Sequence, residues 1–249
     1  MARLLTHNTP AGVASAAADA IVRAVNRHKG HRFNLALSGG STPPLIFRRL
    51  RRLAGRGFAP ERLRLFWIDE RCVPISHPDS NAGSARKHLG HVWNAADVRA
   101  MSGVLAPAVA AQAYARRLQY FGGAHAFDMA LVGLGPDGHV ASLFPGTDAL
   151  EARDTVTIGQ APSGDFRISV TMPVLRAARS LLVVACGASK AWAVREALSG
   201  PPASPFSRVC YGRPRVQMHI DKACSRALSV RGQRPSEGWK IEPDRRGGA

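Results

Sequence analysis

The sequence lacks the features that would place it in a membrane, outside the cell or among zinc proteins. It has no run of eighteen apolar residues, and no apolar export signal follows Met1. Its four cysteines are scattered without a C-x-x-C pair, which argues against both a zinc site and a disulfide framework. We therefore predict a protein of the reducing cytoplasm that has no membrane partner.

Lysine is also scarce: the chain has only five, so 29 of its 34 basic residues are arginines. With 17 acidic residues the net charge is +17, a balance that nucleic-acid-binding proteins also show. The densest cluster, however, lies in a segment whose apolar residues recur at helical spacing, which makes it one solvated helix face. Its members are Arg48, Arg49, Arg51 and Arg52. No aromatic residues interleave with them as a single-strand groove requires, so we predict no nucleic-acid partner.

The chain is long enough for one large α/β domain, because 249 residues can bury a sizeable core. Apolar runs typical of buried parallel strands alternate with segments of helical spacing, and they lie at 33–37, 63–68, 129–132, 181–186 and 216–220. The C-terminal end is rich in glycine, proline and charge. We predict one domain over residues 1–230 and a disordered basic tail over residues 231–249.

A glycine-rich loop directly follows the strand predicted at 33–37. This first loop, residues 38–43, reads Ser-Gly-Gly-Ser-Thr-Pro and runs into the arginine-rich helix. Its glycines let backbone N–H groups approach an anion, and the helix start adds partial positive charge. It has no G-K-[ST] and is not G-x-G-x-x-G, so a monophosphate is the predicted ligand. The alternative is a plain turn that starts a helix.

Charged residues end the next predicted strand, at 63–68. Asp69, Glu70 and Arg71 follow it, and Asn81 opens a helix soon afterwards. Three charged residues at a strand end cannot all be buried without partners. They form either a solvated corner or the wall of a polar site, and we favour the site because the other strands also end in polar turns.

A histidine loop, residues 133–139, follows the strand predicted at 129–132. Its glycines and Pro136 force a sharp turn that carries Asp137 and His139. Ligands of open α/β sheets bind beyond the carboxyl ends of the strands. An ordinary histidine titrates near pH 6.5 and is mostly neutral at pH 7, which suits acid–base chemistry. The alternative is a histidine that caps a helix or faces solvent.

In this order and spacing, the three polar segments resemble the signatures of the 6-phosphogluconolactonase family. The segments at 167–169, 187–191 and 221–223 look similar too, so the likeness covers about residues 5–228. Pro136 and Val140 depart from the pattern, since the family usually has an acidic residue and a threonine there. The resemblance implies a three-layer α/β/α fold with a mostly parallel, Rossmann-like sheet, and no required metal or cofactor.

The activity that the resemblance implies is hydrolysis of 6-phosphogluconolactone to 6-phosphogluconate, the second step of the oxidative pentose phosphate pathway. Water attack on a lactone needs a base and support for an oxyanion, roles that we assign to His139 and Arg71. Asp137 or a backbone carbonyl would fix the histidine tautomer. The expected substrate-binding residues are Gly39, Gly40, Ser41, Thr42, Asp69, Asn81, Arg167 and Lys190. The partner is then a small phosphorylated lactone, and the protein a monomer or weak homo-oligomer.

Two other functions remain open at this point. One is an amino-sugar-phosphate isomerase or deaminase on the same scaffold. The deaminases that resemble this chain place a glutamate five residues after the histidine, where this sequence has Phe144. The other is a sugar-phosphate sensor joined to a DNA-binding motif. About 30 residues precede Phe33 and contain a single predicted helix, which is too little for a helix-turn-helix.

Overall fold

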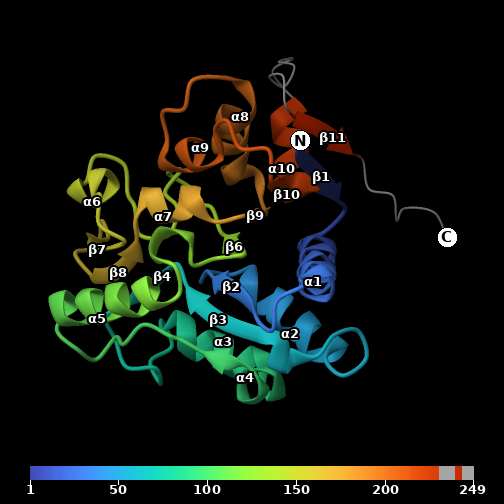
Figure 1. Cartoon of the computed structure of the whole chain (residues 1–249). Helices are drawn as coiled ribbons and strands as arrows, with labels where there is room; N and C mark the ends of the chain where they lie inside the picture. The colour runs from blue at the N-terminus through green and yellow to red at the C-terminus, as the bar shows by residue number, and fades with distance from the viewer. Residues whose placement is uncertain (230–238, 243–249) are drawn as a thin grey trace.

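The computed structural model of the chain describes residues 1–229 and 239–242 (Figure 1). Within them, eight strands form a central sheet in the order β11-β1-β10-β9-β6-β2-β3-β5, and every neighbouring pair is parallel. These strands are β1 (Ala2–His7), β2 (Phe33–Leu37), β3 (Leu63–Trp67), β5 (Asp97–Val98), β6 (Met129–Val132), β9 (Leu181–Ala185), β10 (Val216–Asp221) and β11 (Trp239–Glu242). A smaller antiparallel sheet joins β4 (Asp69–Arg71), β8 (Phe166–Val170) and β7 (Val156–Gln160).

Helices cover both faces of the central sheet (Figure 1). On one face α1 packs on α2 and α2 on α3; on the other α9 contacts α7 and α8, and α8 contacts α10. The α-helices are α1 (Pro10–Arg27), α2 (Pro43–Leu53), α3 (Asn81–Leu89), α4 (His91–Ala95), α5 (Pro107–Tyr120), α6 (Asp148–Glu151), α7 (Met172–Ala177), α8 (Ala191–Ser199), α9 (Pro205–Cys210) and α10 (Lys222–Ser229). Short 3₁₀ turns are η1 (Pro60–Arg62), η2 (Gly123–His125) and η3 (Ala188–Lys190). This confirms the predicted three-layer α/β/α fold.

Local sequence explains where the site-forming helices begin. The Ser80 hydroxyl accepts a hydrogen bond from the Gly83 N–H at 2.9 Å and caps α3. Helix α2 starts at Pro43, where a proline lacks only a hydrogen-bond donor that the first turn does not use. The strands that precede these helices are almost wholly buried, so the polar residues begin where each strand leaves the core.

The order of the strands places three polar segments at one edge of the sheet. Strand β2 lies between β3 and β6, and the chain runs outward from it in both directions. Such a switch in strand order opens a crevice at the carboxyl ends of the neighbouring strands. Residues 38–43 follow β2, residues 69–71 follow β3 and residues 133–139 follow β6, so the three segments meet there.

The prediction of a disordered tail is wrong for residues 239–242, which form β11 beside β1. Without this strand β1 would present an edge of unpaired backbone groups, and such an edge readily pairs with an extended segment. Arg3 adds an ion pair with Glu242 at 2.6 Å. The other residues of the predicted tail, 231–238 and 243–249, lie outside the described residues.

Two further findings bear on the expected cellular setting. No helix of the described residues is both long and apolar enough to cross a bilayer. All four cysteines lie in the described part of the chain, and each is a free thiol. The prediction of a cytoplasmic location remains a prediction.

A cluster of three arginines surrounds Asp97 at the edge strand β5. Arg32 and Arg64 both donate to Oδ2 at 2.7 Å, and Arg99 lies 2.7 Å from Oδ1. Burial raises the pKa of this carboxyl, but the hydrogen bonds from Arg64 and Arg99 outweigh it and hold the pKa below its ordinary value. The carboxylate therefore stabilises the fold above the pKa of the unfolded chain, and this stability is lost as pH falls through the folded pKa.

We expect Asp97→Asn to lower the free energy of unfolding at pH 7 by about 1–3 kcal/mol, because three guanidinium groups lose their shared anion. Urea unfolding at pH 7 and in steps below pH 4 measures the loss, which should shrink as the wild-type carboxyl takes up its proton. Glu61→Gln is the control, since Glu61 is exposed and outside the ion pairs of the described residues. A loss that stays constant with pH would contradict the electrostatic explanation.

Candidate active site

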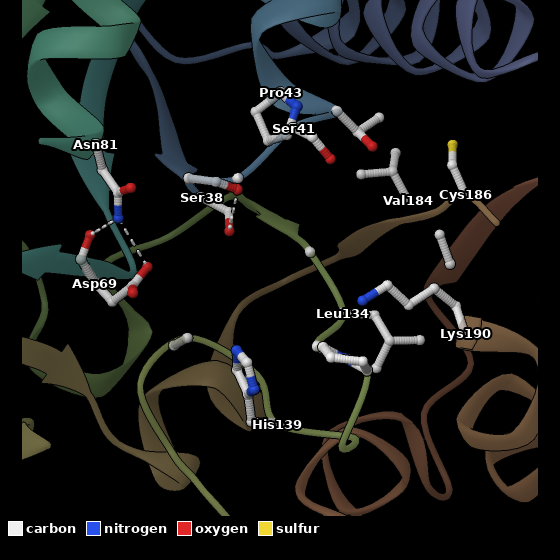
Figure 2. A pocket seen from close by; sticks show the side chains of 18 of the residues that line it. Ser38, Ser41, Pro43, Asp69, Asn81, Leu134, His139, Val184, Cys186 and Lys190 are labelled. Carbon is white, nitrogen blue, oxygen red and sulfur yellow. Dashed lines mark hydrogen bonds between the residues drawn. The ribbon is translucent and has the colours of Figure 1, made fainter. Parts of the chain in front are cut away.

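The polar segments enclose a cavity of about 240 Å³ at the carboxyl edge of the central sheet (Figure 2). Ten of the predicted residues line it, and these are Gly39, Gly40, Ser41, Thr42, Asp69, Arg71, Asn81, His139, Arg167 and Lys190. The remaining one, Asp137, contacts His139 from outside the cavity. The structure thus brings all the predicted site residues together.

The first loop lies close to the start of α3. A Cβ atom on Gly39 would collide with the side-chain amide of Asn81, so only glycine permits this approach. Gly40 has φ of +97°, a conformation that glycine adopts without strain. Burial raises the pKa of the Cys186 thiol, directly after β9, to about 11, although the Thr42 side chain opposes the shift.

Glu70 connects residues 69–71 to the start of α3 through hydrogen bonds to its buried carboxylate. Its carboxylate accepts backbone N–H hydrogen bonds from Arg71 at 2.9 Å and from Asn81 and Ala82 at 2.7 Å. The Ser80 hydroxyl adds a fourth donor at 3.2 Å. Burial raises the pKa of Glu70 above its ordinary value, although the backbone hydrogen bonds oppose the shift. Glu70, only 1% exposed, therefore ties β4 to the start of α3 and turns its neighbours toward the cavity.

We expect Glu70→Gln to lower the free energy of unfolding by about 1–3 kcal/mol. The side-chain amide nitrogen of glutamine cannot accept the hydrogen bonds that backbone N–H groups donate to a carboxylate oxygen in the wild type. Thermal unfolding followed by circular dichroism measures the loss. Glu61→Gln on the surface is the control for the same chemical change. An unaltered melting temperature would show that Glu70 is not the organising group.

Asp69 and Asn81 hold each other and their neighbours. Asn81 donates to Oδ1 of Asp69 at 3.3 Å, and the buried Ser142 hydroxyl donates to Oδ2 at 2.9 Å. Arg71 donates to the Asn81 side-chain oxygen and, at 2.9 Å, to the Asp79 carbonyl. These contacts fix three polar side chains at one end of the cavity, and Figure 2 shows Asp69 and Asn81 there.

His139 is held by its own loop. The carboxylate of Asp137 lies 2.5 Å from Nδ1 and accepts the His139 backbone N–H at 3.2 Å. Burial raises the pKa of Asp137, but the attraction of His139 and the hydrogen bonds with it outweigh burial and leave the pKa below its ordinary value. The ring also packs on Phe144, with centroids 4.5 Å apart. Its Nε2 has no hydrogen-bond partner among the described residues.

Arg167 and Lys190, like Arg71, line the cavity and have no ion-pair partner within residues 1–229 and 239–242. Arg167 on β8 lies directly opposite Arg71 on β4 in the antiparallel pair, an arrangement that costs energy unless an anion offsets it. Burial and the charge of Arg71 lower the pKa of Arg167. Burial likewise lowers the pKa of Lys190, with Asp137 opposing the shift. Figure 2 shows Lys190 extending from η3 into the space between His139 and the first loop.

Sequence reasoning missed several residues that shape the site. Cys186 lines the cavity because it directly follows β9, and the rule that pointed to the other strand ends could have found it. Ser142 supports Asp69 from within the segment after the histidine loop, but a serine there has no distinctive signal. The role of Glu70 depends on contacts with α3 that sequence spacing does not reveal.

The fold and the cavity together define a class of protein: an α/β protein with a histidine and unpaired cations at the switch point of its sheet. The model of one protein family, described as glucosamine-6-phosphate isomerases/6-phosphogluconolactonase, matches residues 8–218. The chain therefore belongs to the family that unites glucosamine-6-phosphate isomerases and 6-phosphogluconolactonases.

Individual relatives agree with this membership. The chain is 36% identical to a 6-phosphogluconolactonase of Nostoc sp., over 80% of this chain and 86% of the relative. It is 37% identical to one of Rattus norvegicus, over 80% of this chain and 82% of the relative. The solved structure of 6-phosphogluconolactonase from Trypanosoma brucei superimposes with a TM-score of 0.78 at 28% identity, covering 92% of this chain and 99% of that one.

Proposed function

We propose that this protein hydrolyses 6-phosphoglucono-1,5-lactone to 6-phosphogluconate, as the second step of the oxidative pentose phosphate pathway in the cytoplasm. One observation supports the proposal most directly: His139, hydrogen-bonded to the Asp137 carboxylate, lines the same cavity as the unpaired cations Arg167 and Lys190. Those cations call for an anionic substrate, and the histidine supplies a base. The Nostoc and rat relatives, which are named 6-phosphogluconolactonases, support the same reaction.

His139 acts as the general base in this proposal. The ionised Asp137 accepts a hydrogen bond from the Nδ1–H group of His139, over an Nδ1–Oδ1 distance of 2.5 Å. The proton therefore stays on Nδ1, and the free lone pair of the ring lies on Nε2. Nε2 takes a proton from a water molecule while the water oxygen forms a bond to the lactone carbonyl carbon. When the tetrahedral intermediate collapses, the ring C–O bond breaks and the leaving oxygen receives that proton. Water is consumed, and the open-chain acid is released.

The charged groups divide the remaining work. Arg71 stabilises the negative charge that develops on the carbonyl oxygen, because its guanidinium remains charged and offers several donors. Arg167 and Lys190 bind the phosphate, together with Gly39, Gly40, Ser41 and Thr42 of the first loop. Asp69 and Asn81 contact the hydroxyl groups of the sugar. Both are almost wholly buried and already hydrogen-bonded, so they would meet the sugar in a fixed geometry.

Phe144 favours the lactonase over the deaminase of the same family. Its ring, 4.5 Å from that of His139, occupies the place of the carboxylate that the resembling deaminases set beside their histidine. A phenyl ring cannot accept a proton or hold an imidazolium in the way that ring opening of an amino sugar requires. Water activation by a neutral imidazole needs no such carboxylate, which fits ester hydrolysis.

The proposal includes no metal and no cofactor. Among the described residues no three His, Cys, Asp or Glu side chains gather into a group that could hold a metal ion. We expect the purified protein to consume 6-phosphogluconolactone, generated in situ, faster than it decays spontaneously, and to do so equally well after treatment with EDTA. Acid release at constant pH measures the rate. Decay at the spontaneous rate would refute the function, and loss of activity with EDTA would refute metal independence alone.

A further inference from the structure

The turn that carries His139 is hydrogen-bonded to the starts of α8 and α9. The indole N–H of Trp192 donates to the carbonyl oxygen of Pro136 at 2.7 Å. The Phe206 N–H, at the start of α9, donates to the carbonyl of Gly138 at 3.0 Å. Both contacts join the turn to helices that lie outside it, and one of them comes from a side chain that does not line the cavity.

The fit between Trp192 and the turn is close. A Cβ atom on Gly138 would lie 2.8 Å from the indole ring and 2.9 Å from Ser204, so both pack against the glycine. Gly138 also has φ of +79°, which a residue with a side chain rarely adopts. The indole is nevertheless 43% exposed, so burial of apolar surface alone does not account for a tryptophan at this position.

Inside the turn, hydrogen bonds hold its residues to one another but do not tie the turn to the rest of the fold. Gly135 donates to the His139 carbonyl at 3.0 Å, and Gly138 donates to the Gly135 carbonyl at 3.2 Å. Asp137, which orients the imidazole, belongs to the same turn and would move with it. The position of the imidazole in the cavity therefore depends on its packing against Phe144 and on the contacts that hold the turn from outside.

We infer that Trp192 is a positioning residue, whose indole N–H fixes the histidine turn so that His139 faces the substrate carbonyl. The inference rests on the proposed lactone hydrolysis for its kinetic consequence. Trp192 lies two residues beyond Lys190, which enters the cavity itself. One short segment thus supplies a cation for the substrate and a hydrogen bond for the catalytic turn. Because misplacement of a catalytic group by about 1 Å can cost a hundredfold in rate, a single hydrogen bond at this place matters.

The test compares Trp192→Phe with Trp93→Phe, which makes the same change in α4, outside the cavity. We expect Trp192→Phe to lower kcat for the lactone about tenfold with KM changed less than threefold, and Trp93→Phe to leave both unchanged. In a His139→Ala background, Trp192→Phe should cause no further loss, because the group that it positions is gone. Equal kcat in the wild type and Trp192→Phe, or an equal loss in both backgrounds, would overturn the inference.

Amide hydrogen exchange separates this inference from the proposed function. Trp192→Phe should speed exchange at Gly135, Gly138 and His139, whatever reaction the protein catalyses. Unchanged exchange would refute the positioning role even in an active lactonase, whereas an inactive wild type with faster exchange in the variant would refute only the function. If Trp192→Phe does not fold, β-(3-benzothienyl)alanine at position 192 keeps the ring shape and removes only the N–H donor. Wild-type kcat in that variant would also overturn the inference.

Discussion

His139→Ala is expected to lower kcat for lactone hydrolysis by about two to four orders of magnitude, the usual contribution of a positioned general base. The variant should still bind 6-phosphogluconate, because the cations and the first loop that we propose for the phosphate remain in the cavity lining. Steady-state kinetics and calorimetric titration of the product measure both effects.

The matched control is His91→Ala, which removes an exposed histidine of α4. It should leave kcat and product binding unchanged. A His139→Ala variant with near wild-type kcat would show that another group activates the water. A variant that loses both turnover and product binding would instead indicate that the histidine loop supports the structure of the whole cavity.

Arg167→Ala and Lys190→Ala are each expected to raise KM for the phosphorylated lactone by about ten- to a hundredfold, and to change kcat much less. A phosphate monoester carries about −1.5 to −2 charges at pH 7. Losing one charged hydrogen-bond partner costs about 1.5–3 kcal/mol of binding, which sets the size of the effect. Neither cation has an ion-pair partner in the described residues, so removing either one leaves no carboxylate without an ion-pair partner.

The same variants should barely affect hydrolysis of unphosphorylated glucono-1,5-lactone, which has no phosphate for them to bind. Arg56→Ala and Lys87→Ala remove exposed cations outside the cavity and serve as controls for net charge. Equal losses on both lactones would remove Arg167 and Lys190 from the phosphate site. An effect of only one of the two variants would assign the phosphate to that side of the cavity.

The gathering of the three polar segments could be predicted from the sequence because it follows from local signals. Each segment directly follows a short buried strand, and parallel strands bring their carboxyl ends to the same edge of a sheet. The residues Gly39, Asp69 and His139 therefore meet in the structure although they are far apart in the chain. No tertiary contact had to be known in advance.

What the sequence did not predict depends on pairing between distant segments. The antiparallel pairing of β4 with β8 places Arg167 opposite Arg71, a neighbour that spacing along the chain does not reveal. The strand at 239–242 was missed because the segment is short and contains few apolar residues. It forms by pairing with the open edge of β1. Such pairings are set by the shape of the folded sheet and leave little trace in composition or spacing.

We propose that this cavity performs ester hydrolysis on a phosphorylated sugar lactone. One preparation of the wild-type protein can be given 6-phosphogluconolactone and, in a parallel assay, glucosamine 6-phosphate, with acid release and ammonia release followed under the same conditions. We predict rapid lactone hydrolysis and no ammonia above the background. Ammonia release from glucosamine 6-phosphate without lactone hydrolysis would refute the proposed lactonase activity and identify the protein as a deaminase of the same family.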